Sequence, residues 1–145
     1  MGQPIIIISG HGEYATGMKS AFELLAGANE NFYFIDFTVE DTDETLRGKF
    51  NNIINKNMNT SILFFCDIMG GTPFKTAALI ANEKENMEVI AGCNLVSLIE
   101  AKFQDDTTSI KELAEVIVNS SINSTCIFKK VKTTGVKYIK TEDGI

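Results

Sequence analysis

Four short apolar segments alternate with segments of helical spacing, and this alternation is the feature that most restricts how the chain can fold. The apolar segments are rich in β-branched and aromatic residues, which predicts strands over Ile5–Ser9, Phe32–Phe37, Ile62–Asp67 and Met87–Ala91. After each segment, apolar residues recur three or four positions apart, which predicts an amphipathic helix. Alternating strands and helices are typical of α/β proteins with a parallel sheet.

The length of 145 residues predicts one domain over 1–145, with its core over about 4–120. For a chain this short we expect a doubly wound, flavodoxin-like, three-layer sandwich with right-handed crossovers and a mostly parallel sheet of order 2-1-3-4. In that order the first and third strands are neighbours at the centre of the sheet. Their carboxyl ends open on the crevice where such sheets bind ligands.

After Ser120 the pattern changes to two short alternating segments with lysines, TCIFKKV (125–131) and VKYIK (136–140). Within this region, 121–140, we expect a fifth strand at a sheet edge, where lysines discourage further pairing. Because no helical crossover precedes it, this strand either runs antiparallel to the sheet or pairs with another subunit. Residues 141–145 are expected to be frayed.

Composition and charge exclude several classes of protein. The formal net charge of −6 argues against nonspecific binding to nucleic acid, because phosphates would be repelled. No apolar run approaches the roughly 20 residues that cross a bilayer, and the N-terminus lacks the basic flank of a signal peptide, so we expect a cytoplasmic location. Cys66, Cys93 and Cys126 are far apart and the chain has one histidine, so we expect reduced thiols and no metal site.

No cofactor is expected, because the sequence has neither a GxxxxGK[ST] motif nor a GxGxxG motif after the first predicted strand.

Two glycine-flanked loops carry the residues that indicate a site. His11 lies in the run SGHG, two residues past the first predicted strand, and Asp67 ends the third. Since those strands are expected to be neighbours, both side chains should reach the same crevice. Thr72 is a good N-cap and Pro73 fits the first helical position, so a helix N-terminus that favours anions should follow the Gly-Gly pair.

This set of groups predicts phosphorylation of a histidine. A neutral imidazole is a good nucleophile toward a phosphoryl group, and a carboxylate on its other nitrogen fixes the tautomer, as Asp67 would for His11. Gly71 and Thr72 are expected to supply N–H and hydroxyl donors to the phosphoryl oxygens. The residues alone leave open that His11 is an idle loop histidine and Asp67 a turn residue.

Two further residues are candidate contacts for a docking protein. Phe37 ends the second predicted strand and is expected at the mouth of the site, and Met69 lies in the loop after Asp67.

The chain resembles the IIA component of the mannose family of the bacterial sugar phosphotransferase system. The resemblance covers about residues 4–120 and rests on four motifs in order: I-x-S-G-H-G (Ile7 to Gly12), IDF (Ile35 to Phe37), F-x-D-x-x-G-G-T-P-F (Phe65 to Phe74) and EVIAGCNLVSLIE (Glu88 to Glu100). The chain departs from the family at Met69, where some members have tryptophan, and at Val96, where many have proline.

The resemblance implies a phosphoryl carrier. His11 would accept a phosphoryl group from phospho-HPr, the small histidine phosphocarrier protein, and pass it to a separate IIB protein for sugar uptake through the membrane components IIC and IID. Asp67 would orient the histidine and Thr72 would contact the phosphate. The resemblance also implies a homodimer that exchanges its C-terminal strand. Neither the sugar nor the ring nitrogen that carries the phosphoryl group follows from the sequence.

Three alternatives remain open at this point. The phosphocarrier subunit of dihydroxyacetone kinase also uses a loop histidine on this fold. A receiver-like signalling module would be phosphorylated on Asp67, but it needs an acidic pair after the first strand, where this chain has only Glu13. A flavin-binding module would need aromatic flanks, and Tyr14 alone offers one.

Overall fold

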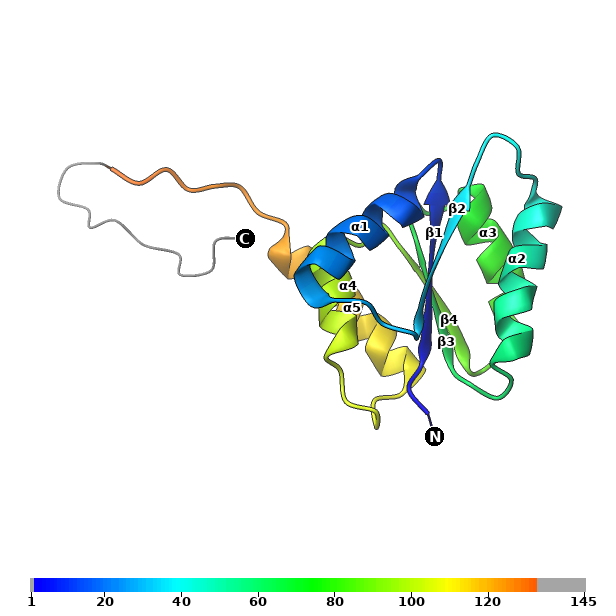
Figure 1. Ribbon diagram of the computed structural model, residues 1–145. Coiled ribbons are helices and arrows are strands. Elements are labelled where there is room, and N and C mark those ends of the chain that lie inside the picture. Colours follow the sequence, from blue (N-terminus) through cyan, green and yellow to red (C-terminus); the bar gives the residue numbers. More distant parts are fainter. Residues whose placement is uncertain (1, 133–145) are drawn as a thin grey trace.

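A four-stranded parallel sheet forms the centre of the molecule (Figure 1). The computed structural model describes residues 2–132. The strands are β1 (Ile5–His11), β2 (Phe32–Phe37), β3 (Ile62–Cys66) and β4 (Met87–Ala91), in the order β2-β1-β3-β4 with every pair parallel. The predicted α/β class and strand order are confirmed.

Five helices cover the two faces of this sheet (Figure 1): α1 (Tyr14–Ala26), α2 (Asp43–Lys56), α3 (Thr72–Ala81), α4 (Leu95–Lys102) and α5 (Ile110–Ser124). Helices α1, α4 and α5 lie on one face, and α2 and α3 on the other. In β1, Ile6 and Ile8 pack into the first hydrophobic cluster, whereas Ile5 and Ile7 pack into the second. A strand buried on both faces cannot alternate with polar residues, which explains the continuous isoleucine run.

Side-chain caps fix where three of the five described helices begin. The Thr42 hydroxyl accepts a hydrogen bond from the Thr45 N–H, and the Thr42 N–H donates one to the Thr45 hydroxyl, which completes a capping box at α2. Asn94 and Ser109 cap α4 and α5 by the same kind of side-chain contact. Helix α3 differs, because its N-cap is Gly71 and no side chain caps it. The prediction that Thr72 is the N-cap is therefore wrong by one position.

Both strands that lead to the predicted site end at positions other than expected. β1 continues through His11, which pairs with Phe37, and the Gly12 N–H donates to the Phe37 carbonyl at 2.8 Å. β3 ends at Cys66, so Asp67 is the first residue after the strand. The backbone of His11 is thus held by the sheet rather than by a free loop.

Residues 125–132, which follow α5, leave the body of the molecule as an extended segment (Figure 1). Helix α5 includes residues 121–124, where we expected the C-terminal strand region to begin. Residues 125–132 form no strand, and Ile127 and Phe128 are 89% and 82% exposed. The second predicted segment, 136–140, and the frayed end, 141–145, lie outside the described residues, so the fifth strand stays a prediction.

Two further findings concern residues 2–132 only. No helix there is both long enough and apolar enough to cross a membrane. No group of three or more His, Cys, Asp or Glu side chains there is placed to hold a metal ion.

Candidate active site

His11 and Asp67 are in direct contact at the carboxyl ends of β1 and β3, although 56 positions separate them in the chain. His11 Nδ1 lies 2.7 Å from Asp67 Oδ2, and the same oxygen accepts the His11 backbone N–H at 2.9 Å. The other carboxylate oxygen accepts the Ile68 N–H at 2.9 Å. The Asp67 N–H donates to the Ser9 carbonyl at 3.2 Å, which ties the carboxylate to the neighbouring strand.

These contacts determine the charge of Asp67 and the tautomer of His11. Burial alone would raise the pKa of the Asp67 carboxyl, but hydrogen bonds from the backbone and ring of His11 and from the Ile68 N–H hold that pKa below its usual value. Asp67 is therefore ionised at neutral pH and can only accept hydrogen bonds. A neutral His11 ring must then carry its proton on Nδ1, which leaves the lone pair of Nε2 free.

The N-terminus of α3 lies against the imidazole ring. A Cβ atom on Gly71 would come within 2.7 Å of His11 Cε1, so a residue without a side chain is required there. The first-turn N–H groups of α3 have no side-chain cap and remain available to an anion. Phe37 contacts the ring edge-on, with centroids 5.8 Å apart and planes at 87°.

Tyr14 forms a wall of the site that the sequence reading missed. A Cβ on Gly10 would lie 2.4 Å from Tyr14 Cδ1 and 2.9 Å from the Asp67 Cβ, so the tyrosine ring packs on Gly10 beside Asp67. Burial, together with the Asp67 charge, raises the pKa of Tyr14 to about 12, and its hydroxyl stays protonated. An aromatic residue three positions after the histidine, in the first turn of a helix, was the available signal.

A second pair of contacts holds α1 in place. Asp36, near the end of β2, accepts the Thr16 N–H at 2.9 Å and the Thr16 hydroxyl at 2.7 Å. A carboxylate from a neighbouring strand thus caps the first turn of α1, where the dipole favours negative charge. This contact fixes the loop between His11 and α1. Nothing in the local sequence pattern pairs Asp36 with Thr16.

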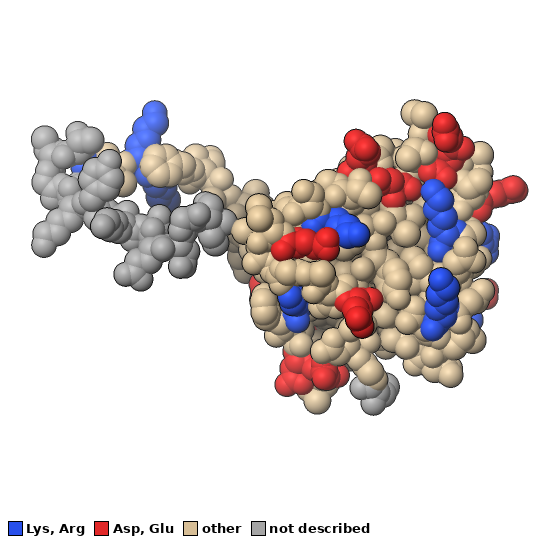
Figure 2. Space-filling model, viewed as in Figure 1, with Lys and Arg blue, Asp and Glu red and all other residues tan. Residues whose placement is uncertain are grey.

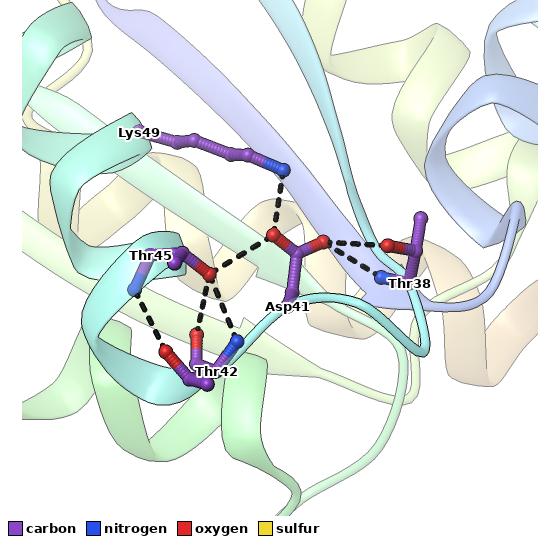
Figure 3. A network of polar contacts seen from close by, with 5 residues as sticks. All are labelled: Thr38, Asp41, Thr42, Thr45 and Lys49. Carbon is purple, nitrogen blue, oxygen red and sulfur yellow. Dashed lines mark hydrogen bonds and ion pairs between the residues drawn. The ribbon is translucent and has the colours of Figure 1, made fainter.

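The β2–α2 loop is held by a network around Asp41 (Figure 3). Asp41 accepts the Thr38 N–H at 2.9 Å and its hydroxyl at 3.0 Å, the Lys49 ammonium at 2.9 Å and the Thr45 hydroxyl at 3.0 Å. The Thr38 N–H and the Lys49 charge hold the pKa of Asp41 well below its usual range. The loop that follows Phe37 is therefore anchored to α2.

An open groove of about 380 Å³ runs between α2 and α3 beside the site, lined by Phe37, Thr42, Asp43, Thr72 and Lys75 among others. Phe37 and Thr72 therefore line one groove, and Phe37 also contacts the His11 ring. Met69 is 82% exposed in the loop between Asp67 and α3.

Figure 2 shows acidic side chains gathered at the end of the molecule where the carboxyl ends of the strands lie.

Comparison with known proteins gives the family. Residues 5–118 match the family EIIA-man, described as the PTS system fructose IIA component. The mannose-specific EIIAB component of the PTS system of Escherichia coli (strain K12) is 38% identical over 117 residues, which cover 79% of this chain and 36% of that protein. The chain thus spans little more than a third of that relative. The sorbose-specific EIIA component of Lacticaseibacillus casei is 28% identical over 132 residues, covering 91% of this chain and 96% of that protein.

A solved structure supports the fold. The mannose/sorbose specific IIA subunit of the phosphotransferase system from Enterococcus faecalis superposes with a TM-score of 0.84 at 23% identity, covering 92% of this chain and all of that one. The family match extends from the first residue of β1 into α5, and so includes the whole sheet and both halves of the site. The chain belongs to the EIIA-man family of phosphotransferase-system IIA components.

Proposed function

We propose that the protein is a cytoplasmic phosphoryl carrier of the sugar phosphotransferase system and that His11 forms a transient phosphohistidine. The observation that carries this proposal is the 2.7 Å contact between His11 Nδ1 and Asp67 Oδ2. It occupies one ring nitrogen and leaves the other free on a side chain that is 46% exposed. An oriented, accessible imidazole is what a phosphoryl donor needs to meet.

The transfer step uses Nε2 as the nucleophile. The Nε2 lone pair attacks the phosphorus of phospho-HPr, the N–P bond of the donor breaks with its electron pair returning to the donor histidine, and a new Nε2–P bond forms. The Nδ1 proton stays in place, and Asp67 stabilises the positive charge that the ring gains. The reverse sequence delivers the group to a IIB protein. Asp67 and the His11 ring both return to their starting state at the end of the cycle.

Helix α3 is the proposed binding site for the phosphoryl oxygens. Its uncapped N-terminus lies against Cε1 of His11, the ring atom that joins Nδ1 to Nε2. A group on Nε2 therefore stands near the N–H groups that begin at Gly71 and near the Thr72 hydroxyl. These donors, with the helix dipole, offset the charge of the transferring group without a metal ion.

We propose phospho-HPr as the donor and a IIB protein as the acceptor, with the membrane components IIC and IID acting downstream. Met69 and Phe37 are the apolar contacts offered to both partners: Met69 is 82% exposed in the loop, and Phe37 lies beside the ring. We also propose a homodimer that exchanges the C-terminal region. The exposed Ile127 and Phe128, on a segment with no partner among the described residues, support it.

The alternatives gain less support. Relatives named for mannose and sorbose systems favour a sugar transporter over the phosphocarrier subunit of dihydroxyacetone kinase. For a receiver-like module, both carboxylate oxygens of Asp67 are already engaged by N–H groups and the His11 ring. A receiver-like module also needs an acidic pair after its first strand, and only Glu13 lies there.

Incubation with phosphoenolpyruvate, enzyme I and HPr, followed by intact-mass measurement, tests the proposal. We expect one acid-labile phosphate on the wild-type protein and none on His11→Ala. A phosphate that survives His11→Ala, or that resists acid, would overturn the assignment.

A further inference from the structure

We propose that Lys75 is a further phosphoryl-binding residue, whose ammonium group contacts the phosphoryl oxygens on His11. This inference rests on the proposed function and adds to it the full positive charge that backbone N–H groups do not provide. Lysine suits the role because its ammonium is a compact charge with three donors on a flexible stem.

The position of Lys75 on α3 directs its side chain toward the site. The Lys75 N–H donates to the Gly71 carbonyl at 2.9 Å, so Lys75 lies one helical turn after the residue that touches the His11 ring. Side chains on a helix tilt toward its N-terminus and cover the preceding turn. An exposed lysine at this position can therefore reach back over Gly71 and Thr72.

The groove beside the ring joins Lys75 to the histidine. Lys75, Thr72 and Phe37 line the same cavity of about 380 Å³, and Phe37 also contacts the His11 ring. Asp67 occupies Nδ1, and Cε1 faces Gly71, so Nε2 is the ring nitrogen next to the α3 side. A phosphoryl group on Nε2 would therefore stand next to the groove that Lys75 lines.

The charges around the site make an added cation useful. A phosphoryl group carries close to −2 at neutral pH and would stand beside the ionised Asp67. Within residues 2–132 the ion pairs are His11–Asp67 and Lys49–Asp41, so no carboxylate lies within 4.0 Å of the Lys75 ammonium. Asp43 lines the same groove, but its carboxylate forms no ion pair with the Lys75 ammonium. The ammonium is available for an incoming anion.

The test compares Lys75→Met with Lys84→Met. Both lose one exposed lysine, but Lys84 follows the other end of α3 and lines a different cavity, beside Asn86 and Met87. His11 is phosphorylated with phosphoramidate, a small donor that needs no partner protein, and the 31P shift is followed against pH. Loss of Lys75 should lower the acid dissociation constant of the phosphoryl group roughly threefold to tenfold, the range of an exposed charge-assisted contact.

The same pair of variants is then equilibrated with phospho-HPr. Lys75→Met should shift the phosphoryl equilibrium toward HPr by a similar factor, Lys75→Arg should recover most of it, and Lys84→Met should match the wild type. Thermal unfolding of each variant checks the fold, and Lys75→Gln replaces Lys75→Met if that variant is less stable.

The outcomes separate this inference from the function beneath it. If Lys75→Met and Lys84→Met both titrate like the wild type, Lys75 does not contact the phosphoryl group, and His11 phosphorylation still stands. If the wild-type protein takes no phosphate on His11 from either phosphoramidate or phospho-HPr, the proposed function itself is wrong.

Discussion

Replacing Asp67 with asparagine removes the charge of the orienting group while keeping its shape. The asparagine oxygen can still accept one hydrogen bond, but it no longer stabilises the positive ring that forms when Nε2 is phosphorylated. In the structure Asp67 accepts the ring contact at 2.7 Å and two backbone N–H groups at 2.9 Å, with a side chain only 12% exposed. The lost interaction is therefore one charge-assisted hydrogen bond in a largely dry setting.

Such a bond contributes about 1.5–3 kcal/mol, and each ~1.4 kcal/mol is a factor of ten in rate, so phosphoryl transfer should slow about 10- to 150-fold. Because the His11 ring is 46% exposed, water screens part of the effect, and we expect the lower end of that range. Rapid-quench measurement of transfer from phospho-HPr gives the rate. Nitrogen-15 NMR of the His11 ring reports the Nδ1–H tautomer in the same samples.

The matched control is Asp36→Asn, which neutralises a carboxylate on the neighbouring strand that contacts Thr16 and not the histidine. Its rate should stay within about threefold of the wild type, because asparagine can still accept a hydrogen bond from Thr16 and the His11 ring keeps the carboxylate of Asp67. If Asp67→Asn also transfers at that rate and keeps its fold, the orienting role of Asp67 is refuted.

Three further predictions follow from the geometry of single residues. Gly71→Ala places a Cβ 2.7 Å from His11 Cε1 and should slow transfer roughly tenfold to a hundredfold by displacing the ring; a normal rate in quench experiments would show that the ring tolerates the shift. Gly48→Ala, inside α2, is its control, since no atom lies within 4 Å of the added Cβ. Chemical denaturation should show that the free energy of unfolding rises by about 0.5–1 kcal/mol. A less stable variant would contradict the assignment of Gly48 to a helix. The pKa values of Asp67 and Asp41 are both lowered in the folded protein, so their contribution to stability is complete above the ordinary carboxyl value and is lost as pH falls below about 4. Urea unfolding at a series of pH values should show this fall in the free energy of unfolding, and the fall should be shallower for Asp41→Asn. If the wild type and Asp41→Asn lose stability equally, Asp41 does not contribute to the pH dependence.

Topology was the part of the fold that the sequence allowed us to predict. Strand order and handedness follow from general rules for α/β sheets, and those rules alone bring His11 and Asp67 to one edge. The buried pattern of β1 and the caps at Thr42, Asn94 and Ser109 also follow from local chemistry. These features depend on residue type and order, which the sequence contains.

Atomic contacts across elements were the part that could not be predicted. The packing of Tyr14 on Gly10, the capping of α1 by Asp36 and the approach of Gly71 to the ring depend on how far each helix is displaced along its strand. A shift of one residue is also what moved the N-cap of α3 from Thr72 to Gly71. Periodicity fixes the buried face of an element but not its position to within an ångström.

The measurement that tests the central claim most directly is the identity of the phosphorylated atom. Nitrogen-15 NMR of the phosphorylated protein, with nitrogen–phosphorus coupling observed on the His11 ring, distinguishes the two ring positions. The contact between Nδ1 and Asp67 predicts a phosphoryl group on Nε2, with the Nδ1 proton retained. Phosphorus coupled to Nδ1, or a phosphate found on a residue other than His11, would contradict the account.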